Sequence, residues 1–142
     1  KSYILRLRFP FDSDLDSPRN YLRKLINYPK IVDSLNSITN IQDFTNVTFD
    51  IINKNLPFGK YNIFNEGPVY TKEVINILTK HLNLEKKEWF DSIEEFQKTV
   101  KAKRTNCVLS TEKLKSFEIV LDNAYDSIEK SIVKFKENKI GK

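Results

Sequence analysis

The chain has 142 residues, of which 24 are Lys or Arg and 19 are Asp or Glu, so its formal net charge at neutral pH is +5. This length suits one domain, since a chain of this size buries roughly two-thirds of its unfolded surface. The hydrophobic share of 39% and the aromatic share of 12% exclude a disordered chain. No apolar run approaches the ~20 residues of a membrane-spanning helix, so an integral membrane protein is not expected.

Scarce residue types limit the chemistry further. The single cysteine, Cys107, excludes an internal disulfide framework and a Cys-rich zinc site, and the single histidine, His81, excludes a metal site with several imidazoles. The three glycines form neither GxGxxG nor GxxxxGK[ST], which excludes a self-contained nucleotide-phosphate loop. None of the six tyrosines has a lysine four residues later, so a Tyr-x-x-x-Lys acid–base pair is absent. We therefore assign no catalytic residue and no metal ligand to this chain.

Periodicity and turn residues predict helices with a few short strands in one compact α/β unit. Ser17 and Thr71 are the expected helix caps, and Ser92 with Glu95 matches the capping box Ser-x-x-Glu. The predicted elements, in chain order, are a strand over 3–9 that ends at Pro10, a helix over 17–28, a strand over 31–32, a turn over 36–40, a helix over 41–55, a strand over 61–64, a turn over 65–68, a helix over 71–82, a connecting segment around 89–90, a short helix from 92, an extended segment over 104–109, a short helix over 110–114, and a last helix from about 122 whose tail frays after 136.

The cationic residues divide into two groups. Lysines are interleaved with acids, as in residues 85–88, which is typical of a solubilising surface and disfavours nucleic acid as a partner. The arginines are fewer, and Arg104 lies at the entry to an extended segment while Arg19 lies in the first turn of a predicted helix. A guanidinium matches phosphate oxygens. Arg104, and Arg19 less strongly, are therefore candidate anion-binding residues, with an ion pair to a nearby acid as the alternative.

Five short segments, taken in order, carry a resemblance to a known family. They are residues 5–10, 17–21, 36–39, 61–67 and 104–106. Their order and spacing resemble the C-terminal half of nucleotide-sugar reductases of the extended short-chain dehydrogenase superfamily. The closest likeness is to the UDP-rhamnose-forming 4-keto-6-deoxy-glucose 3,5-epimerase/4-reductases, and dTDP-4-dehydrorhamnose reductases are more distant.

This resemblance implies a domain organisation and a cofactor. Residues 1–10 would be the last part of the cofactor-domain sheet of a Rossmann-type fold, and residues 11–142 the substrate-binding domain with elements that return to that sheet. The cofactor loop and the catalytic Tyr and Lys would lie in a missing N-terminal half. NAD(P)H would be bound by the parent enzyme and not by this chain alone, with Pro10 near the nicotinamide.

The resemblance also implies substrate-binding residues. Arg104 and its companion Asn106 would face the substrate diphosphate. The remaining residues of the set given below would line the nucleotide pocket. Three positions depart from the family pattern: Glu66 replaces a proline, and Ile38 and Phe9 each replace a methionine. The implied substrate-binding residues are Arg104, Asn106, Arg19, Asn20, Asn36, Ser37 and Thr39.

The implied function is the sugar-nucleotide-binding part of a cytoplasmic NAD(P)-dependent epimerase/reductase. The parent would epimerise a UDP- or dTDP-linked 4-keto-6-deoxyhexose through enol intermediates and then reduce it at C4. A homodimer is one expected assembly of the parent, and this chain alone would be inactive. Two alternatives stay open. One is a standalone basic helical binding module without catalysis. The other is a parent that is a dehydratase, a plain epimerase or a non-catalytic relative.

Overall fold

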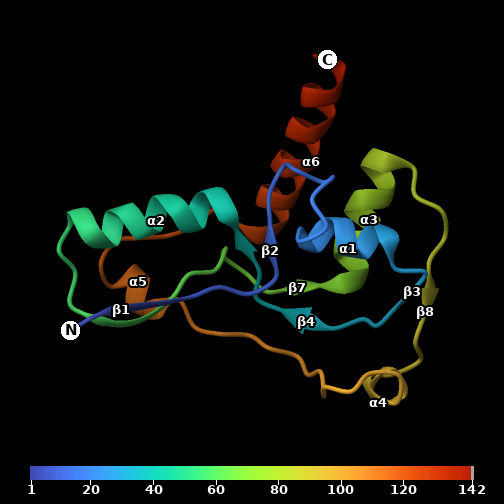
Figure 1. Ribbon diagram of the computed structural model, residues 1–142, viewed down its shortest axis with the longest axis horizontal. Coiled ribbons are helices and arrows are strands. Elements are labelled where there is room, and N and C mark those ends of the chain that lie inside the picture. The colour runs from blue at the N-terminus through green and yellow to red at the C-terminus, as the bar shows by residue number, and fades with distance from the viewer. Residues whose placement is uncertain (142) are drawn as a thin grey trace.

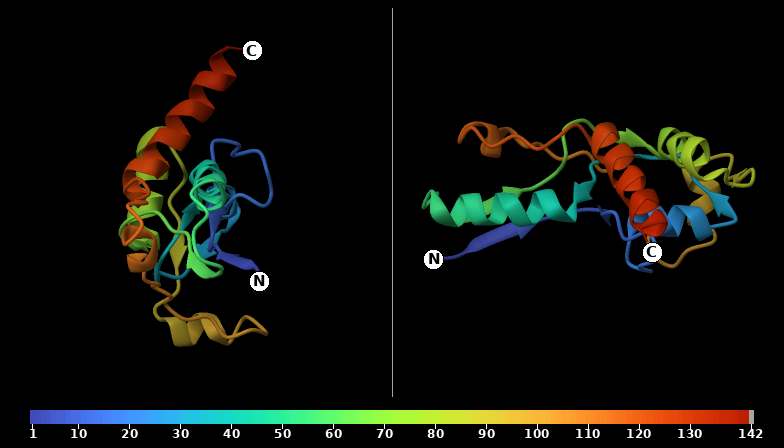
Figure 2. Two further views of the ribbon diagram at one scale, coloured as in Figure 1. Left: turned by 90° about the vertical axis from the view of Figure 1, so that its left-hand side faces the viewer. Right: turned by 90° about the horizontal axis from the view of Figure 1, so that it is seen from above.

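The computed structural model describes residues 1–141, in which helices surround short pairs of strands (Figure 1). A long C-terminal helix extends beyond the rest of the molecule (Figure 2). The elements are β1 (Tyr3–Arg6), β2 (Pro10–Phe11), α1 (Tyr21–Asn27), β3 (Lys30–Ile31), β4 (Leu35–Asn36), β5 (Thr39–Asn40), α2 (Ile41–Asn53), β6 (Gly59–Asn62), β7 (Val69–Tyr70), α3 (Thr71–Leu82), β8 (Glu88–Trp89), α4 (Ile93–Gln97), α5 (Glu112–Lys115) and α6 (Ala124–Ile140).

The strands form four separate pairs. β1 and β6 are parallel, with Tyr3 opposite Gly59 and Arg6 opposite Asn62. β2–β5 and β3–β8 are also parallel, whereas β4–β7 is antiparallel. Parallel strands are normally buried inside larger sheets, and a two-stranded pair is marginal by itself. These pairs therefore owe their stability to the helices that pack around them.

Two hydrophobic clusters hold the elements together. One lies between α1, α3 and α6, where Leu22, Leu78 and Ile128 are fully buried. The other lies between α2, α5 and β6, with Ile51 and Tyr61 at its centre. Helices α2 and α3 show apolar residues at i, i+3 and i+4 on the buried face, which is the pattern that the sequence predicted.

Buried asparagines join the two clusters. The Asn40 side chain caps α2, accepting from the backbone N–H groups of Gln42 at 2.9 Å and Asp43 at 3.2 Å. Its amide nitrogen donates to Ser131 on α6 at 3.3 Å. Asn65 accepts from the Asn40 backbone N–H at 2.7 Å and donates to the Asp43 carboxylate at 2.7 Å. Because each buried polar group has a partner, this region stabilises the fold.

Several predicted boundaries at the start of the chain are wrong. The first strand ends at Arg6, because Phe9 adopts a left-handed backbone with φ of 44° and turns the chain. Pro10 does not end a strand but begins β2. The cap of α1 is Asn20 and not Ser17: the Asn20 side chain accepts from the Leu22 N–H and its amide donates to the loop at residues 12–14.

Later elements differ from the prediction in similar ways. Thr71 is the first residue of α3 and not its cap, and its hydroxyl donates to the Ser34 carbonyl. In the first turn of this helix, the Asp33 carboxylate accepts from the Lys72 N–H at 3.0 Å. The strand predicted over 61–64 is β6 at Gly59–Asn62, and the segment around Trp89 is a strand, β8. Helix α6 continues to Ile140, so its described tail does not fray; Lys142 lies outside the described residues.

The cap of α2 gives a test of this fold. Asn40→Ala removes the acceptor for two helix N–H groups, and we expect the free energy of unfolding to fall by about 1–2 kcal/mol in denaturant titrations. Asn53→Ala, at the exposed end of the same helix, is the matched control and is expected to change it by less than about 0.5 kcal/mol. Equal effects of the two substitutions contradict the capping role.

Candidate functional site

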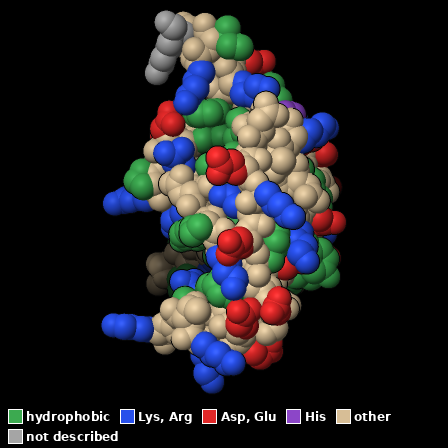
Figure 3. Space-filling model, turned by 90° about the vertical axis from the view of Figure 1, so that its right-hand side faces the viewer, with side chains coloured by type: hydrophobic (Ala, Val, Ile, Leu, Met, Phe, Trp, Pro, Cys, Tyr) green, Lys and Arg blue, Asp and Glu red, His purple; other side chains and the backbone are tan. Residues whose placement is uncertain are grey.

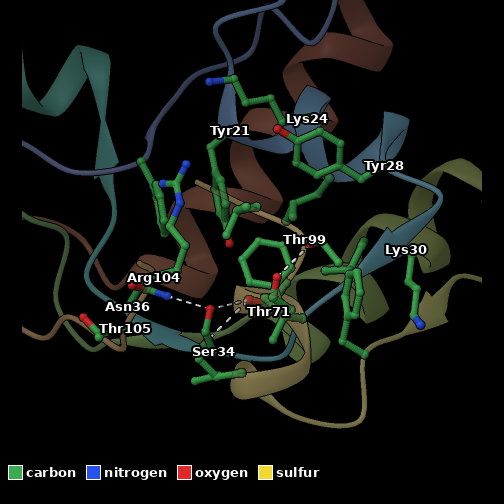
Figure 4. Close-up of a pocket in the computed structure, with 18 of the residues that line it drawn as sticks. Tyr21, Lys24, Tyr28, Lys30, Ser34, Asn36, Thr71, Thr99, Arg104 and Thr105 are labelled. Atoms are coloured by element: carbon green, nitrogen blue, oxygen red, sulfur yellow. Dashed lines mark hydrogen bonds between the residues drawn. The ribbon is translucent and has the colours of Figure 1, made fainter. Parts of the chain in front are cut away.

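A cavity of about 590 Å³ opens between α1, β3 and the segment that contains α4 (Figure 4). The turn between β1 and β2 contributes Arg8 and Phe9, and the loop that follows α4 contributes Arg104. These segments lie far apart in the sequence, and the parallel pairing of β3 with β8 carries the chain to α4, which lines the same cavity as α1. A cavity of this size can hold a ligand as large as a nucleotide.

Positive charge collects in the cavity. Its lining includes five cationic side chains and, among the described residues, no carboxylate. One of these cations, Lys30, is paired with Glu95 at 3.3 Å. Elsewhere, the face shown in Figure 3 has cations and acids interspersed. The cavity therefore favours anions in a way that this face of the surface does not. The cationic lining residues are Arg8, Arg19, Lys24, Lys30 and Arg104.

A chain of hydrogen bonds runs along one wall of the cavity. The Arg8 guanidinium donates twice to the Asn36 side-chain oxygen, from Nε at 3.2 Å and from Nη2 at 2.8 Å. The Asn36 amide donates to the Ser34 hydroxyl at 2.9 Å, and that hydroxyl lies 3.3 Å from the hydroxyl of Thr71 (Figure 4). Asn36 and Thr71 are buried, so this polar chain is rigid.

Aromatic rings form the adjoining wall. The Phe9 ring stacks on that of Tyr21, with centroids 4.8 Å apart and planes 5° apart, and the Arg8 guanidinium lies 4.4 Å from the Phe9 ring centre. Phe9 holds its left-handed backbone immediately before a proline, a conformation that costs of order 1–3 kcal/mol. Burial raises the pKa of Tyr21 to about 12, partly offset by a hydrogen bond with Thr71. Tyr21 therefore presents a neutral hydroxyl at physiological pH.

The far end of the cavity is apolar. Phe90 and Phe96 meet edge to face with centroids 5.2 Å apart, and Ile93 on α4 lies beside them. Lys30 lies 4.3 Å from the Phe90 ring centre. A cationic end and an apolar aromatic end within one cavity suit an amphipathic ligand, such as one with a phosphorylated part and a flat ring-shaped part.

Four of the residues singled out from the sequence line this cavity. They are Arg104, Arg19, Asn36 and Pro10. The side chains of Arg104 and Arg19 are exposed at the rim, and the Arg104 carbonyl is anchored by the Gln97 amide at 2.6 Å. Three distant segments thus bring these residues to one place.

The other four residues lie outside the lining and make structural hydrogen bonds. Asn20 caps α1, and Thr39 donates to the Ile63 carbonyl at 2.8 Å. Ser37 accepts from the Leu109 N–H at 3.1 Å, and Asn106 accepts from the Leu35 N–H at 3.0 Å. Their bonds support the segments that carry the lining residues.

Sequence reasoning did not select Arg8, Tyr21, Ser34 or Thr71 as site residues. Arg8 follows an alternating strand pattern and so resembles an ordinary solvent-facing residue. The available signal was its place beside Pro10, within a segment that carries the family resemblance. Ser34 and Thr71 join the site through tertiary contact, which no local pattern indicates.

The glycines of the described residues do not form the glycine-rich loop of a dinucleotide site. Gly59 and Gly67 have positive φ values of 144° and 81°, but Gly59 begins a strand and Gly67 lies in the turn before β7, so neither opens a helix that could hold a pyrophosphate. Within residues 1–141, no group of three or more acidic, His or Cys side chains could hold a metal ion. No helix in that range is long and apolar enough to cross a membrane.

The architecture is that of the Rossmann-type short-chain dehydrogenases and reductases. The dTDP-4-dehydrorhamnose reductase of Clostridium acetobutylicum matches with a TM-score of 0.74 over 94% of this chain and 49% of its own, at 16% identity. At that identity, the match concerns the fold alone. The fold class expected from the sequence is thereby confirmed.

Sequence comparison narrows the relationship. No family model matches the chain. A bifunctional dTDP-4-dehydrorhamnose 3,5-epimerase/reductase of Arabidopsis thaliana is 33% identical over 132 residues, which are 92% of this chain and 42% of that protein. A trifunctional UDP-glucose 4,6-dehydratase/UDP-4-keto-6-deoxy-D-glucose 3,5-epimerase/UDP-4-keto-L-rhamnose-reductase from the same plant is also 33% identical over 132 residues, which are 19% of its length.

A solved structure agrees with these relatives. The L780 UDP-rhamnose synthase of Acanthamoeba polyphaga mimivirus matches with a TM-score of 0.81 at 26% identity, over 92% of this chain and 45% of its own. The chain is a homologue of the rhamnose-forming nucleotide-sugar epimerase/reductases, which confirms the resemblance drawn from its sequence. It spans less than half the length of the relatives it matches.

The buried Tyr21 gives a pH test. An unfolded tyrosine ionises near pH 10, whereas folded Tyr21 keeps its proton to about pH 12, so the folded state loses stability as the pH rises between these values. At pH 11 we expect the wild type to have lost about 1.4 kcal/mol more than Tyr21→Phe, relative to pH 9, in denaturant titrations. Tyr28→Phe, at a half-exposed ring, is expected to behave as the wild type. Parallel pH curves for the wild type and Tyr21→Phe contradict the assignment.

Proposed function

We propose that the chain is the sugar-nucleotide-binding part of an NAD(P)-dependent nucleotide-sugar epimerase/reductase of the rhamnose-forming type. The cation-lined cavity carries this proposal, because its arginines come from three segments and converge without a carboxylate. Homology to proteins named as rhamnose epimerase/reductases supports the choice of a nucleotide sugar over other anions. UDP- and dTDP-linked 4-keto-6-deoxyhexoses are the proposed substrates.

Within such an enzyme, the cavity would bind and orient the substrate. The arginines would hold the diphosphate, and the aromatic end at Phe90 and Phe96 would take the nucleoside. Fixing both parts leaves the sugar ring in one orientation, which lowers the entropic cost of the reaction. The hydride donor and the acid–base pair would come from another part of the protein, with Pro10 near the nicotinamide. Cytoplasmic location and dimerisation remain predictions from the family.

The open edge of β1 supports the proposal that residues 1–10 belong to a larger sheet. Ser2 and Arg6 direct their carbonyls to β6, accepting from Gly59 at 3.0 Å and from Ile63 at 2.9 Å. Because direction alternates along a parallel strand, the backbone groups of Tyr3 and Leu5 point to the opposite edge. In residues 1–141 no other strand pairs there. An open edge of this kind is a template for a further strand.

Exposed apolar side chains on β1, on α2 and before β6 support the same proposal. Ile4 on β1, Phe49 and Ile52 on α2, and Phe58 before β6 are 47–59% exposed. Several large apolar side chains exposed in one region commonly mark an interface. The proposed cover is the N-terminal half of the same protein, in agreement with the greater length of the relatives.

Arg104 offers a test of the proposed function. In the complete enzyme, Arg104→Ala should weaken sugar-nucleotide binding by ~1.5–3 kcal/mol, the range for a charged hydrogen bond. Isothermal calorimetry with the UDP- and dTDP-sugars measures the change. Lys103→Ala, which removes an exposed cation next to it in the chain, is the matched control and should leave affinity within twofold. Unchanged affinity in Arg104→Ala contradicts its role.

Hydrogen exchange tests the proposed sheet. In the complete protein, the Leu5 amide should exchange as slowly as the Ile4 and Arg6 amides, because a strand from the other half pairs with it. Mass spectrometry or NMR with residue resolution measures the rates. Exchange of Leu5 more than about a hundredfold faster than that of its two neighbours shows that the edge stays open and contradicts the domain assignment.

A further inference from the structure

Arg8 differs from the other cavity arginines in how it is held. Its side chain donates two hydrogen bonds to Asn36, whereas among the described residues no side-chain bond or ion pair fixes Arg19 or Arg104. Arg8 is half-buried, and the rim arginines are exposed. An ordered guanidinium loses little freedom when it binds a ligand, so each hydrogen bond that it forms contributes more to affinity.

The partner of Arg8 leaves its charge available. Asn36 is neutral, so it orients the guanidinium without neutralising it. Arg8 forms no salt bridge in the described part of the chain, and no carboxylate lines the cavity. A half-buried cation in such a setting is expected to need an anion, since an unpaired charge is costly to bury. That anion must come from the ligand.

The orientation of Asn36 is itself fixed. Its amide nitrogen donates to the Ser34 hydroxyl, and only its oxygen is then directed to Arg8. The Ser34 hydroxyl lies 3.3 Å from that of Thr71, which also donates to the Ser34 carbonyl at 3.2 Å. Thr71 begins α3, so the chain of bonds connects Arg8 to a rigid helix.

The geometry that remains suits a phosphoryl group. Arg8 has five N–H donors, of which Asn36 engages two, and the Phe9 ring covers one face of the guanidinium. The remaining donors lie at its edge, where a guanidinium binds two phosphate oxygens side by side. Building on the proposed function, we infer that Arg8 anchors the diphosphate of the nucleotide sugar, and that Asn36, Ser34 and Thr71 are its positioning residues.

In this assignment the inner arginine and the rim arginines have different roles. Arg8 fixes the diphosphate inside the cavity, while Arg104 and Arg19 add charge at the rim. A contact at an ordered, half-buried site depends on geometry, whereas exposed cations act mostly through charge. Replacing Arg8 by lysine should therefore harm binding even though the charge is kept, because an ammonium cannot form the same fork with Asn36.

Calorimetry on the complete protein tests the inference with four probes: UDP, dTDP, inorganic pyrophosphate and uridine. For Arg8→Gln we expect affinity for UDP and pyrophosphate to fall roughly 10- to 100-fold while affinity for uridine stays within about twofold. Arg8→Lys and Asn36→Asp should lower UDP affinity by roughly 5- to 20-fold, the latter because a carboxylate neutralises Arg8. Arg6→Gln, with the same charge change two residues earlier in the chain, is the control and should bind UDP as the wild type does.

The outcomes separate this inference from the proposed function. A wild type that binds UDP, with an Arg8→Gln variant of equal affinity, overturns the Arg8 assignment and leaves the function standing. A wild type that binds pyrophosphate through Arg8 but neither UDP nor dTDP supports the anion site and overturns the nucleotide-sugar function. Equal losses for uridine and UDP in Arg8→Gln indicate a general structural role and also overturn the assignment.

Discussion

The structure depends on full hydrogen bonding of one buried polar segment, residues 36–40. These five residues lie where the two hydrophobic clusters meet, and each polar side chain among them bonds to a different part of the chain: Asn36 to Arg8, Ser37 to Leu109, Thr39 to Ile63, and Asn40 to α2 and Ser131. Buried polar groups destabilise a fold unless they are paired, so this pattern specifies how the surrounding segments are placed. The cavity is one consequence of this placement. Asn36 orients Arg8 by hydrogen bonds and forms a β-bridge with Cys107, which supports the segment that follows Arg104.

The cavity in turn combines rigid and peripheral parts. Its wall of Arg8, Asn36, Phe9 and Tyr21 is built from ordered, mostly buried groups, and a strained backbone at Phe9 persists there because the stacking and hydrogen bonds around it hold it in place. Its rim comes from the segment with α4, which adds Arg104 and two aromatic rings. A binding site with a fixed cationic subsite and a more exposed cover can orient an anionic ligand while still admitting it. The proposed binding of a nucleotide sugar requires this property.

The sequence predicted the long helices well and the short strands poorly, for a physical reason. Helices α2 and α3 bury a stripe at i, i+3 and i+4, and that stripe is visible in the sequence. Two-residue strands such as β3 and β8 have no period to detect and form because helices bring them together. The sequence predicted Ser17 as the cap of α1, whereas Asn20 caps it. The Asn20 side chain accepts from the Leu22 N–H and donates to the Asp12 carbonyl, and the second bond exists only in the folded loop. In the site, Arg104 was recognisable by its arginine chemistry and by the family pattern, whereas Arg8 was hidden in an alternating strand and is distinguished by its tertiary contact with Asn36.

The most direct measurement is a crystal structure of the complete protein with UDP bound. The account predicts that the diphosphate lies in the cavity with oxygens within hydrogen-bond distance of the Arg8 guanidinium and near Arg104, and that the Arg8–Asn36 pair is unchanged from the present structure. A diphosphate bound elsewhere, with Arg8 facing away from it, would contradict the account.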